Sequence, residues 1–395
     1  MELLMKRNIN VQLYFVLFYF FVFFGIGSLY PLLGVYLKDD IGLTGTQIGI
    51  IMSISPVVMI VIQPMWGMLS DYTQKPRQLL TLAIVLTGVV GIVYSYASSY
   101  MMFIIIAALL AVMQSAIVPI SDSMTLTYTE RHRKNYGSIR LWGAIGFAFS
   151  VFIVGKLADF YGLGVIFFAF AIILFISALF AIKLPNESQS MKVNLRAGLS
   201  QLIRLRRFVL FLLTTFLIFG PIHANNTYFG ILITEMGGST GQVGMAFLLA
   251  AGSEAPFMLF AGRWIKRIGI LQVLLFASFV SGARWLFYFF EPSLTVIYAT
   301  TIAQGISVGF FIPAALQYVR DIAPSKVRAT AISLYSAAGI GLGSWFCNFF
   351  GGVILERFSI NNVYLFFSLL TVVGLITLLF VIIIDNKRRT VSSLS

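Results

Sequence analysis

The stretch VQLYFVLFYFFVFFGIGSLYPLLGVYL, residues 11–37, decides the fold class. It contains no charged residue and does not alternate between polar and apolar positions. A helix needs about 20 apolar residues to cross a bilayer, whereas a strand of a membrane barrel has about 10 residues of alternating polarity. The stretch therefore predicts a transmembrane helix.

The composition of the whole chain gives the same answer. Of its 395 residues, 59% are hydrophobic and only 10% are charged, against about 25% charged residues in a soluble domain. Apolar runs follow one another along the chain and predict an all-α membrane protein with twelve transmembrane helices. The predicted spans are 9–37, 45–70, 78–97, 100–128, 137–157, 163–184, 208–234, 242–264, 270–290, 293–319, 327–355 and 361–384.

The N-terminal sequence and the cysteine content argue against a signal peptide and against a disulfide. MELLMKRNIN leads directly into the first span without a small-residue cleavage site, so we interpret that span as a helix and not as a removed signal peptide. The single cysteine, Cys347, excludes an internal disulfide.

The net charge of +13 is an orientation signal. If both termini lie in the cytoplasm, most of the basic residues fall in the termini and in the cytoplasmic loops, as the positive-inside rule requires. The charge therefore does not indicate a nucleic-acid partner. We expect a multi-pass protein of the cell membrane, in a bacterial cytoplasmic membrane, with both termini cytoplasmic.

The chain contains an internal repeat. TGTQIG at 44–49 resembles STGQVG at 239–244, and in both copies a glycine follows the glutamine by 20 residues. The repeat predicts an N-terminal six-helix bundle (1–184), a cytoplasmic central loop (185–207) and a C-terminal six-helix bundle (208–395). Parallel six-helix repeats characterise one large transporter architecture, whose substrate site lies between the halves.

The loop GMLSDYTQKPR, residues 67–77, is similar to the signature loop of the major facilitator superfamily. The resemblance covers essentially the whole chain and implies that fold, with this loop as part of a gate. The glycine would permit close helix approach, and the aspartate would pair with bases or with a helix N-terminus. The alternative is a solvated loop with charged ends. The gate-loop residues are Gly67, Asp71, Lys75 and Arg77.

Within the superfamily the chain most resembles the lactose-permease-like branch of proton-coupled oligosaccharide, nucleoside and phenylpropionate permeases. YGSIRLWG (136–143) is similar to the fifth-helix segment of that branch, in which an arginine pairs with an acid on the fourth helix. The resemblance implies a pair between Arg140 and Asp122. Glu254 on the eighth span and Arg284 on the ninth also resemble intramembrane charges of the lactose permease.

The tenth span departs from that branch. IAQGISVGF (302–310) has Gln304 and Ser307 where the branch has a histidine and a proton-carrying glutamate. Proton coupling must therefore depend on other acids or be absent.

Asp122, Glu254, Arg140 and Arg284 are the charges placed well inside predicted spans. An ionised group at bilayer depth costs about 3 kcal/mol on insertion scales, so such groups pair or line a watery cavity. We expect Asp122 and Arg140 to line a substrate cavity, and Glu254, Arg284 and Asp122 to be candidates for proton coupling. Alternatively, either arginine snorkels to an interface, Asp122 and Arg140 form a structural ion pair, or Glu254 is structural.

Two further groups are candidates for the wall of the cavity. FGPIHANNTYFG (219–230) places His223, Asn225 and Asn226 at depth, where they suit either a hydroxyl-rich ligand or a hydrogen-bonded helix contact. Trp142 and Phe147 would stack on a ring, or else face lipid or pack in the core. Gln304 completes the set.

These features predict a secondary active transporter working by alternating access. We expect proton-coupled uptake of a small polar solute such as a sugar, a nucleoside or an aromatic acid, by a monomer in the lipid bilayer. A proton-driven efflux antiporter and a non-transporting membrane sensor are the alternatives. HExxH and Walker motifs are missing from the sequence, which argues against a zinc protease or an ATP-driven pump. No cofactor and no metal site are expected.

Overall fold

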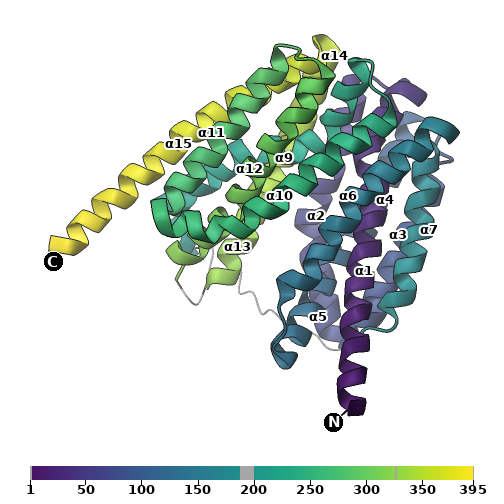
Figure 1. Cartoon of the computed structure of the whole chain (residues 1–395), viewed down its shortest axis with the longest axis horizontal. Coiled ribbons are helices and arrows are strands. Elements are labelled where there is room, and N and C mark those ends of the chain that lie inside the picture. Colours follow the sequence, from purple (N-terminus) through teal and green to yellow (C-terminus); the bar gives the residue numbers. More distant parts are fainter. Residues whose placement is uncertain (1, 187–199, 325–326, 395) are drawn as a thin grey trace. The chain divides into compact units, whose positions relative to one another are not determined.

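The computed structural model describes residues 2–186, 200–324 and 327–394, and this part of the chain is helical without strands. Figure 1 shows the helices in chain order. In these ranges, eleven helical segments are long and apolar enough to cross a membrane, and Val165–Ala181 is a shorter apolar helix. The predicted all-α membrane fold is confirmed. Residues 187–199 of the predicted central loop lie outside the described ranges.

The chain forms two compact units. Unit 1 consists of Met1–Ser190 together with Phe229–Leu248, and unit 2 consists of Met191–Tyr228 together with Leu249–Ser395. Phe229–Leu248 holds the end of one long helix and the start of the next, and we call it the hairpin segment.

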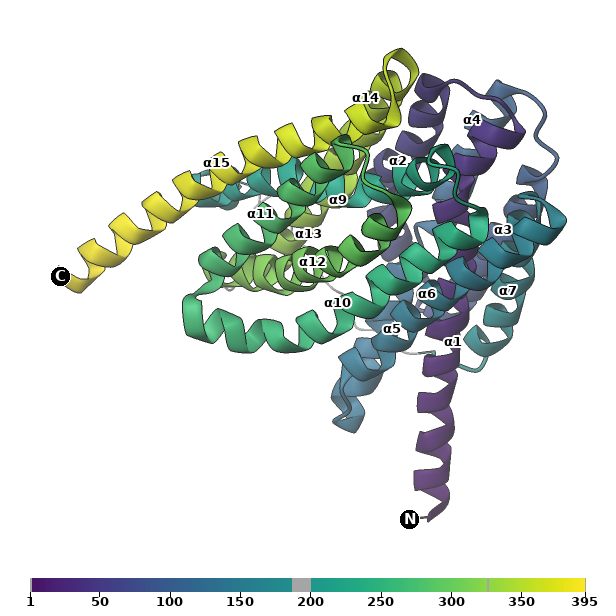
Figure 2. The same ribbon diagram turned by 45° about the horizontal axis from the view of Figure 1, so that its top comes forward.

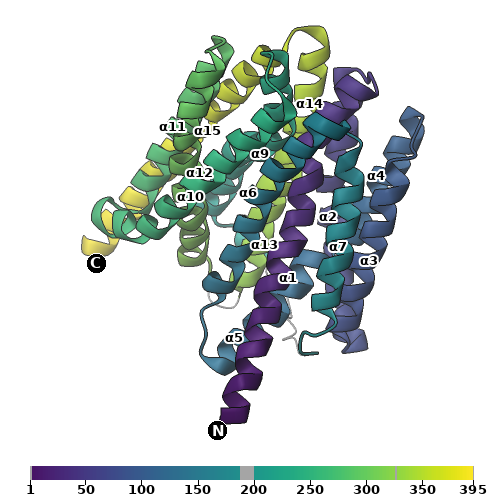
Figure 3. The same ribbon diagram turned by 45° about the vertical axis from the view of Figure 1, so that its right-hand side comes forward.

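Unit 1 is built around its first helix. The helix α1 packs along α6 and α7, while α3 lies beside α7 and α2 beside α4, as Figures 1 and 3 show. The elements are α1 (Glu2–Val35), the π-helix η1 (Tyr36–Asp40), α2 (Gly45–Thr73), α3 (Pro76–Tyr94), α4 (Tyr100–Gln114), α5 (Ile117–His132), α6 (Tyr136–Tyr161) and α7 (Val165–Ala181).

The predicted fourth span, 100–128, corresponds to one membrane-spanning segment, Tyr100–His132, whose helix is interrupted after Gln114. The helix α4 ends at Gln114 and α5 begins at Ile117. Between them the hydroxyl of Ser115 donates a hydrogen bond to the carbonyl oxygen of Val112, 2.8 Å away. A serine that bonds back to its own helix competes with the backbone ladder and favours a bend. The interruption lies seven residues before Asp122 on the same span.

The sequence repeat has a structural counterpart at two helix starts. The amide of Gln47 donates to Thr44 Oγ1 at 3.4 Å, and the amide of Thr44 donates to Gln47 Oε1 at 3.0 Å, which is a capping box at the start of α2. Ser239 and Gln242 make the same reciprocal pair at 3.3 and 2.8 Å before α10. The two copies therefore begin their second helix with the same hydrogen bonds.

In unit 2, α11 packs along α12 and α15, and Figure 2 shows α11 and α15 side by side. Trp285, Tyr288 and Tyr364 are fully buried and pack against one another in edge-on and tilted contacts, with ring centroids 5.2–6.2 Å apart. The elements are α9 (Arg206–Glu235), α10 (Thr240–Ile268), α11 (Ile270–Phe289), α12 (Leu294–Ile322), α13 (Arg328–Ser336), the π-helix η3 (Ala337–Gly343), α14 (Ser344–Arg357) and α15 (Ile360–Leu394). The hairpin segment contains the last residues of α9 and the first of α10.

Candidate functional site

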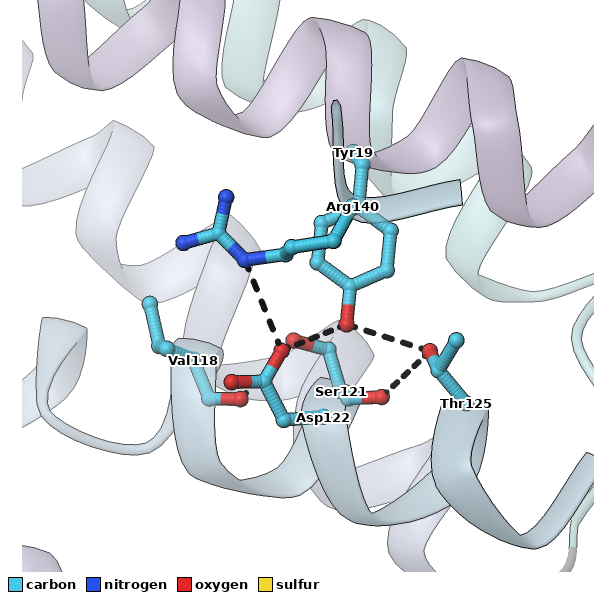
Figure 4. Close-up of polar contacts among 6 residues, drawn as sticks. All are labelled: Tyr19, Val118, Ser121, Asp122, Thr125 and Arg140. Atoms are coloured by element: carbon cyan, nitrogen blue, oxygen red, sulfur yellow. Dashed lines mark hydrogen bonds and ion pairs between the residues drawn. The ribbon is translucent and has the colours of Figure 1, made fainter. Parts of the chain in front are cut away.

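Unit 1 contains a cluster of polar side chains from α1, α5 and α6, drawn in Figure 4. The hydroxyl of Tyr19 donates to Asp122 Oδ1 at 2.6 Å and lies 3.1 Å from Thr125 Oγ1. Arg140 Nε lies 3.8 Å from the same Asp122 oxygen. One carboxylate oxygen therefore faces both a neutral donor and a cation, brought together by three helices.

The guanidinium of Arg140 lies on an aromatic surface of α1. Its Cζ is 4.0 Å from the ring centroid of Phe23 and 5.5 Å from that of Tyr19. A cation over an aromatic face is attracted by the ring quadrupole, and the attraction grows where water is excluded. The Arg140 side chain therefore points toward Asp122 and these two rings, and belongs to the cluster.

The cluster is only partly enclosed by protein. The side chains of Arg140 and Asp122 remain 30% and 28% exposed, although Tyr19 is fully buried. Because both side chains stay partly exposed, the carboxylate can accept hydrogen bonds from a hydroxyl-rich ligand and the guanidinium can donate hydrogen bonds to it. The ionised groups are thus held in place by Tyr19 and Phe23 while one side stays accessible.

Unit 2 contains a second line of polar groups, from α10, α11 and α12. Arg284 Nη1 donates to Gln304 Oε1 at 2.7 Å, and Gln304 Nε2 lies 3.3 Å from Glu254 Oε1. Gln304 therefore connects the acid to the base, with its carbonyl toward the guanidinium and its amide toward the carboxylate. The two charges that the sequence analysis singled out in this half lie at opposite ends of one amide.

The two ends of this line differ in their surroundings. Arg284 is 4% exposed, Gln304 is 8% exposed, and the guanidinium of Arg284 lies 4.2 Å over the ring of Trp285. Arg284 Nε has no hydrogen-bond partner among the described residues. Glu254 is half-buried. Snorkelling does not describe Arg284, because its charged head is enclosed by protein.

The polar residues of the seventh span lie in different surroundings: one is buried in a helix contact and two are half-buried. Asn225 is 1% exposed and its Oδ1 accepts a hydrogen bond from Tyr364 at 3.1 Å, so it joins α9 to α15. His223 and Asn226 are half-buried and lie one turn apart on α9. The ring of His223 meets Phe219 edge-on at 4.6 Å. Asn225 is thus engaged in packing, while His223 and Asn226 stay candidates for a cavity wall.

The two aromatic candidates near Arg140 lie on different faces of α6. Trp142 is 42% exposed and stands two residues from Arg140, about 200° around the helix. Phe147 follows Arg140 by two turns on the same face, and its backbone and ring lie against Gly27 of α1. Phe147 therefore lies in the contact between α6 and α1, two turns from Arg140, and Trp142 lies on another face of α6.

The gate-loop candidates join α2 to α3. The Gln74 carbonyl accepts from Asn186 Nδ2 at 3.4 Å, and the amide of Arg77 donates to Asn186 Oδ1 at 3.2 Å, which ties the loop to the residues after α7. A Cβ added to Gly67 would meet no described atom within 4 Å, so no close helix contact is made there in this structure, and the expected approach stays a prediction. A glycine only permits close contact; it does not create it. The gating role of Asp71, Lys75 and Arg77 stays a prediction.

Tyr19, Phe23 and Trp285 are among the residues of these clusters that escaped sequence reasoning. Two of them sit in an aromatic run of the first span, where nothing in the sequence separates a ring that faces a cluster from one that faces lipid. The available signal was the hydroxyl of Tyr19, since a buried phenol usually has a partner. Trp285 follows Arg284 directly, and cation–π contacts often involve tryptophan.

Comparison with known proteins places the chain in a family. Residues 13–366 match the MFS_1 like family. The chain is 50% identical over 377 residues to the maltose permease of Geobacillus stearothermophilus, covering 95% of each protein. It is 44% identical over 374 residues to the transporter YwbF of Bacillus subtilis, covering 94% of each.

Among solved structures, the nucleoside transporter NupG shares the fold. The TM-score is 0.85 at 17% identity, over 94% of this chain and 99% of that one. The match to the family spans most of the chain, as do the two curated relatives. The chain therefore belongs to the MFS_1 like family and is a secondary active transporter of the oligosaccharide and nucleoside permease branch, not an enzyme.

Proposed function

We propose that the protein imports a disaccharide of the maltose class together with a proton. The observation that carries this proposal is the partly exposed pair of Asp122 and Arg140, fixed by Tyr19 and Phe23. The 50% identity to a maltose permease over nearly the full length of both chains supports the choice of sugar. The protein acts as a monomer in a bacterial cytoplasmic membrane, with both termini in the cytoplasm.

The chemistry of the cluster suits a neutral sugar. Two adjacent hydroxyls of a hexose can donate to the carboxylate of Asp122 while ring and hydroxyl oxygens accept from the guanidinium of Arg140. Because the acid and the base balance each other, a neutral ligand adds no uncompensated charge at depth. An anionic or cationic substrate would leave one of the two groups repelled.

The proton belongs to Glu254. Glu254 and Arg284 are connected through Gln304, so the carboxylate and the guanidinium compensate each other across one amide. Protonation of Glu254 removes its negative charge and leaves the charge of Arg284 uncompensated. The stability of the Glu254–Gln304–Arg284 chain then depends on whether these groups are exposed to water. A carboxyl that is enclosed in one state and near water in another takes up a proton on one side and releases it on the other.

The test of the substrate is uptake of radiolabelled maltose into proteoliposomes. Arg140→Gln should abolish uptake, whereas Arg267→Gln, at an exposed base at the end of α10, should leave it unchanged. Competition by unlabelled maltose, melibiose and a nucleoside ranks the substrates. Uptake that survives in Arg140→Gln, or is inhibited best by the nucleoside, would contradict the proposal.

Proton coupling is tested with an imposed pH gradient, acidic outside. Glu254→Gln should lose gradient-driven accumulation and keep exchange of internal for external maltose, because exchange needs no net proton movement. Glu291→Gln is the matched control, since this acid lies outside the cluster and its Oε1 accepts from Asn361. Undiminished accumulation in Glu254→Gln would exclude Glu254 as the proton carrier.

Orientation is tested with single cysteines in a Cys347→Ser background. Ser98 lies in the loop between α3 and α4, and Lys75 lies in the loop between α2 and α3; both are exposed. An impermeant maleimide added to intact cells should label a cysteine at position 98 and not one at position 75. The reverse pattern would place the termini outside.

A further inference from the structure

Asp159, near the end of α6, is bound by the first residues of the hairpin's second helix. Its carboxylate accepts from Ser239 Oγ at 2.9 Å, from Thr240 Oγ1 at 2.6 Å and from the amide of Gly241 at 3.0 and 3.1 Å. The Thr240 hydroxyl also lies 3.0 Å from the carbonyl oxygen of Gly155. Every donor of this set lies at the start of α10 or directly before it.

This contact combines two stabilising effects. A carboxylate that accepts from a backbone amide and two hydroxyls makes charge-assisted hydrogen bonds, which are the strong class. The amide belongs to the first turn of a helix, where the helix dipole also favours a negative charge. Asp159 therefore holds α10 by a specific set of donors and not by a diffuse attraction.

A second ionic contact joins the hairpin segment to unit 1 at the same end of the helices. Lys38, in η1 after α1, forms a salt bridge with Glu235, the last residue of α9. The two side chains are 28% and 32% exposed. Because exposed ion pairs contribute little, we rank this pair below Asp159.

Between the two ionic contacts the backbones touch through glycines. A Cβ added to Gly155 would lie 2.5 Å from the Thr240 carbonyl oxygen, and one added to Gly244 would lie 2.7 Å from Phe152 Cα. A Cβ added to Gly230 would lie 2.8 Å from the carbonyl oxygen of Pro31. Any larger residue at these positions would force the hairpin segment away from α1 and α6.

The hairpin segment thus belongs by sequence to the second six helices and by contacts to the first. The hairpin segment consists of the end of α9, the connecting loop and the start of α10. The rest of α9 and the rest of α10 belong to unit 2. A transporter that alternates its access must open and close such a junction on each side of the membrane in turn.

We propose that Asp159, assisted by the Lys38–Glu235 pair, is the latch of the outer gate. It holds the hairpin segment against α1 and α6 while the path to the outside is closed, and its release admits substrate. The proposal rests on the transport function and on the orientation given above. It assigns Asp159 a positioning role in the transport cycle, since nothing places it near the substrate cluster.

The latch is tested by spin-label distances in the full-length protein reconstituted in lipid. Labels go on Ser98→Cys, in the α3–α4 loop, and Met236→Cys, in the hairpin, within a Cys347→Ser background; the native cysteine is fully buried. No substrate is needed for the measurement. Release of the latch should move the hairpin away from the loop and add a population at longer distance.

Asp159→Asn should raise the ratio of long to short distances by about tenfold, the effect of losing a charge-assisted hydrogen-bond set. Lys38→Glu should raise it by about threefold, because the pair is exposed. The exchanged double variant Lys38→Glu with Glu235→Lys should return to the parent distribution. Glu291→Gln, which changes an acid bound to Asn361 outside the hairpin segment, should leave the distribution unchanged.

Gly244→Ala supplies an independent steric test. The added Cβ cannot fit against Phe152 in the closed arrangement, so this variant should also populate the long distance without any change of charge. An unaltered distribution in both Asp159→Asn and Gly244→Ala overturns the latch, even if maltose uptake is normal. A normal latch response in a protein that fails to transport maltose overturns only the proposed substrate.

Discussion

Gly143 leaves the space that the guanidinium of Arg140 fills: a Cβ built at Gly143 would lie 2.9 Å from Arg140 Nη1 and 2.9 Å from Phe23 Cδ2. Gly143→Ala should therefore push Arg140 away from Phe23 and Asp122. We expect the KM for maltose to rise about tenfold, the cost of weakening a hydrogen bond to a charged group. Initial rates of uptake over a range of maltose concentrations measure it.

The control for this variant is Gly262→Ala, the same chemical change on α10 where an added Cβ meets no described atom within 4 Å. Its KM should equal that of the parent. If Gly143→Ala also kept the parent KM, the fit between the glycine and the arginine would have no bearing on transport.

Tyr19→Phe keeps the ring beneath Arg140 and removes the hydroxyl that binds Asp122 and Thr125. Without that hydrogen bond the carboxylate is less well positioned, so KM should rise by about three- to tenfold while the maximal rate changes little. Tyr161→Phe, at a tyrosine that is 78% exposed, should change neither. A lowered maximal rate with an unchanged KM would place Tyr19 in the conformational cycle instead.

Gln304→Leu removes the amide between Glu254 and Arg284 and leaves a buried guanidinium without its acceptor. We expect the variant to lose about 1–3 kcal/mol of stability, visible as a melting temperature lowered by several degrees. Gln78→Leu, at an exposed glutamine of α3, should melt like the parent. Differential scanning fluorimetry of the purified proteins decides, and equal melting temperatures would show that Gln304 is dispensable.

Arg207 and Asp385 join the start of α9 to the C-terminal half of α15, with Nη1 and Oδ1 3.2 Å apart and the side chains 19% and 8% exposed. Asp385→Asn should cost about 2 kcal/mol, because it leaves a largely buried cation without its counter-charge. Asp321→Asn, at an exposed acid of α12, serves as the control. The double exchange Arg207→Asp with Asp385→Arg should recover part of the melting temperature, and failure to do so would point to the other contacts of Asp385.

The helices and the repeat followed from the sequence because their signals are local. An uncharged apolar run such as 11–37 is stable only in the hydrocarbon of a membrane. The Thr44–Gln47 capping box is formed by residues three positions apart. The same applies to Ser239 and Gln242. The break after Gln114 was missed, because an apolar sequence continues through it and only the hydroxyl of Ser115 marks the bend.

The clusters were partly predictable for a different reason. A charge at bilayer depth is costly, so Asp122, Arg140, Glu254 and Arg284 stand out from an apolar chain. Their neutral neighbours carry no such mark: which face of α1 meets α5, and hence the position of Tyr19, is decided by packing across a hundred residues of chain. Asp159 was overlooked because an acid near the end of a span costs little there.

The matched capping boxes have an evolutionary consequence. Two helices that begin with the same reciprocal bonds, 195 residues apart, are what tandem copying of a half-length ancestor would leave. An even number of crossings lets both copies insert the same way round, so such an ancestor could have worked as a self-associating pair. Divergence then needed only to give each copy its own acid and base.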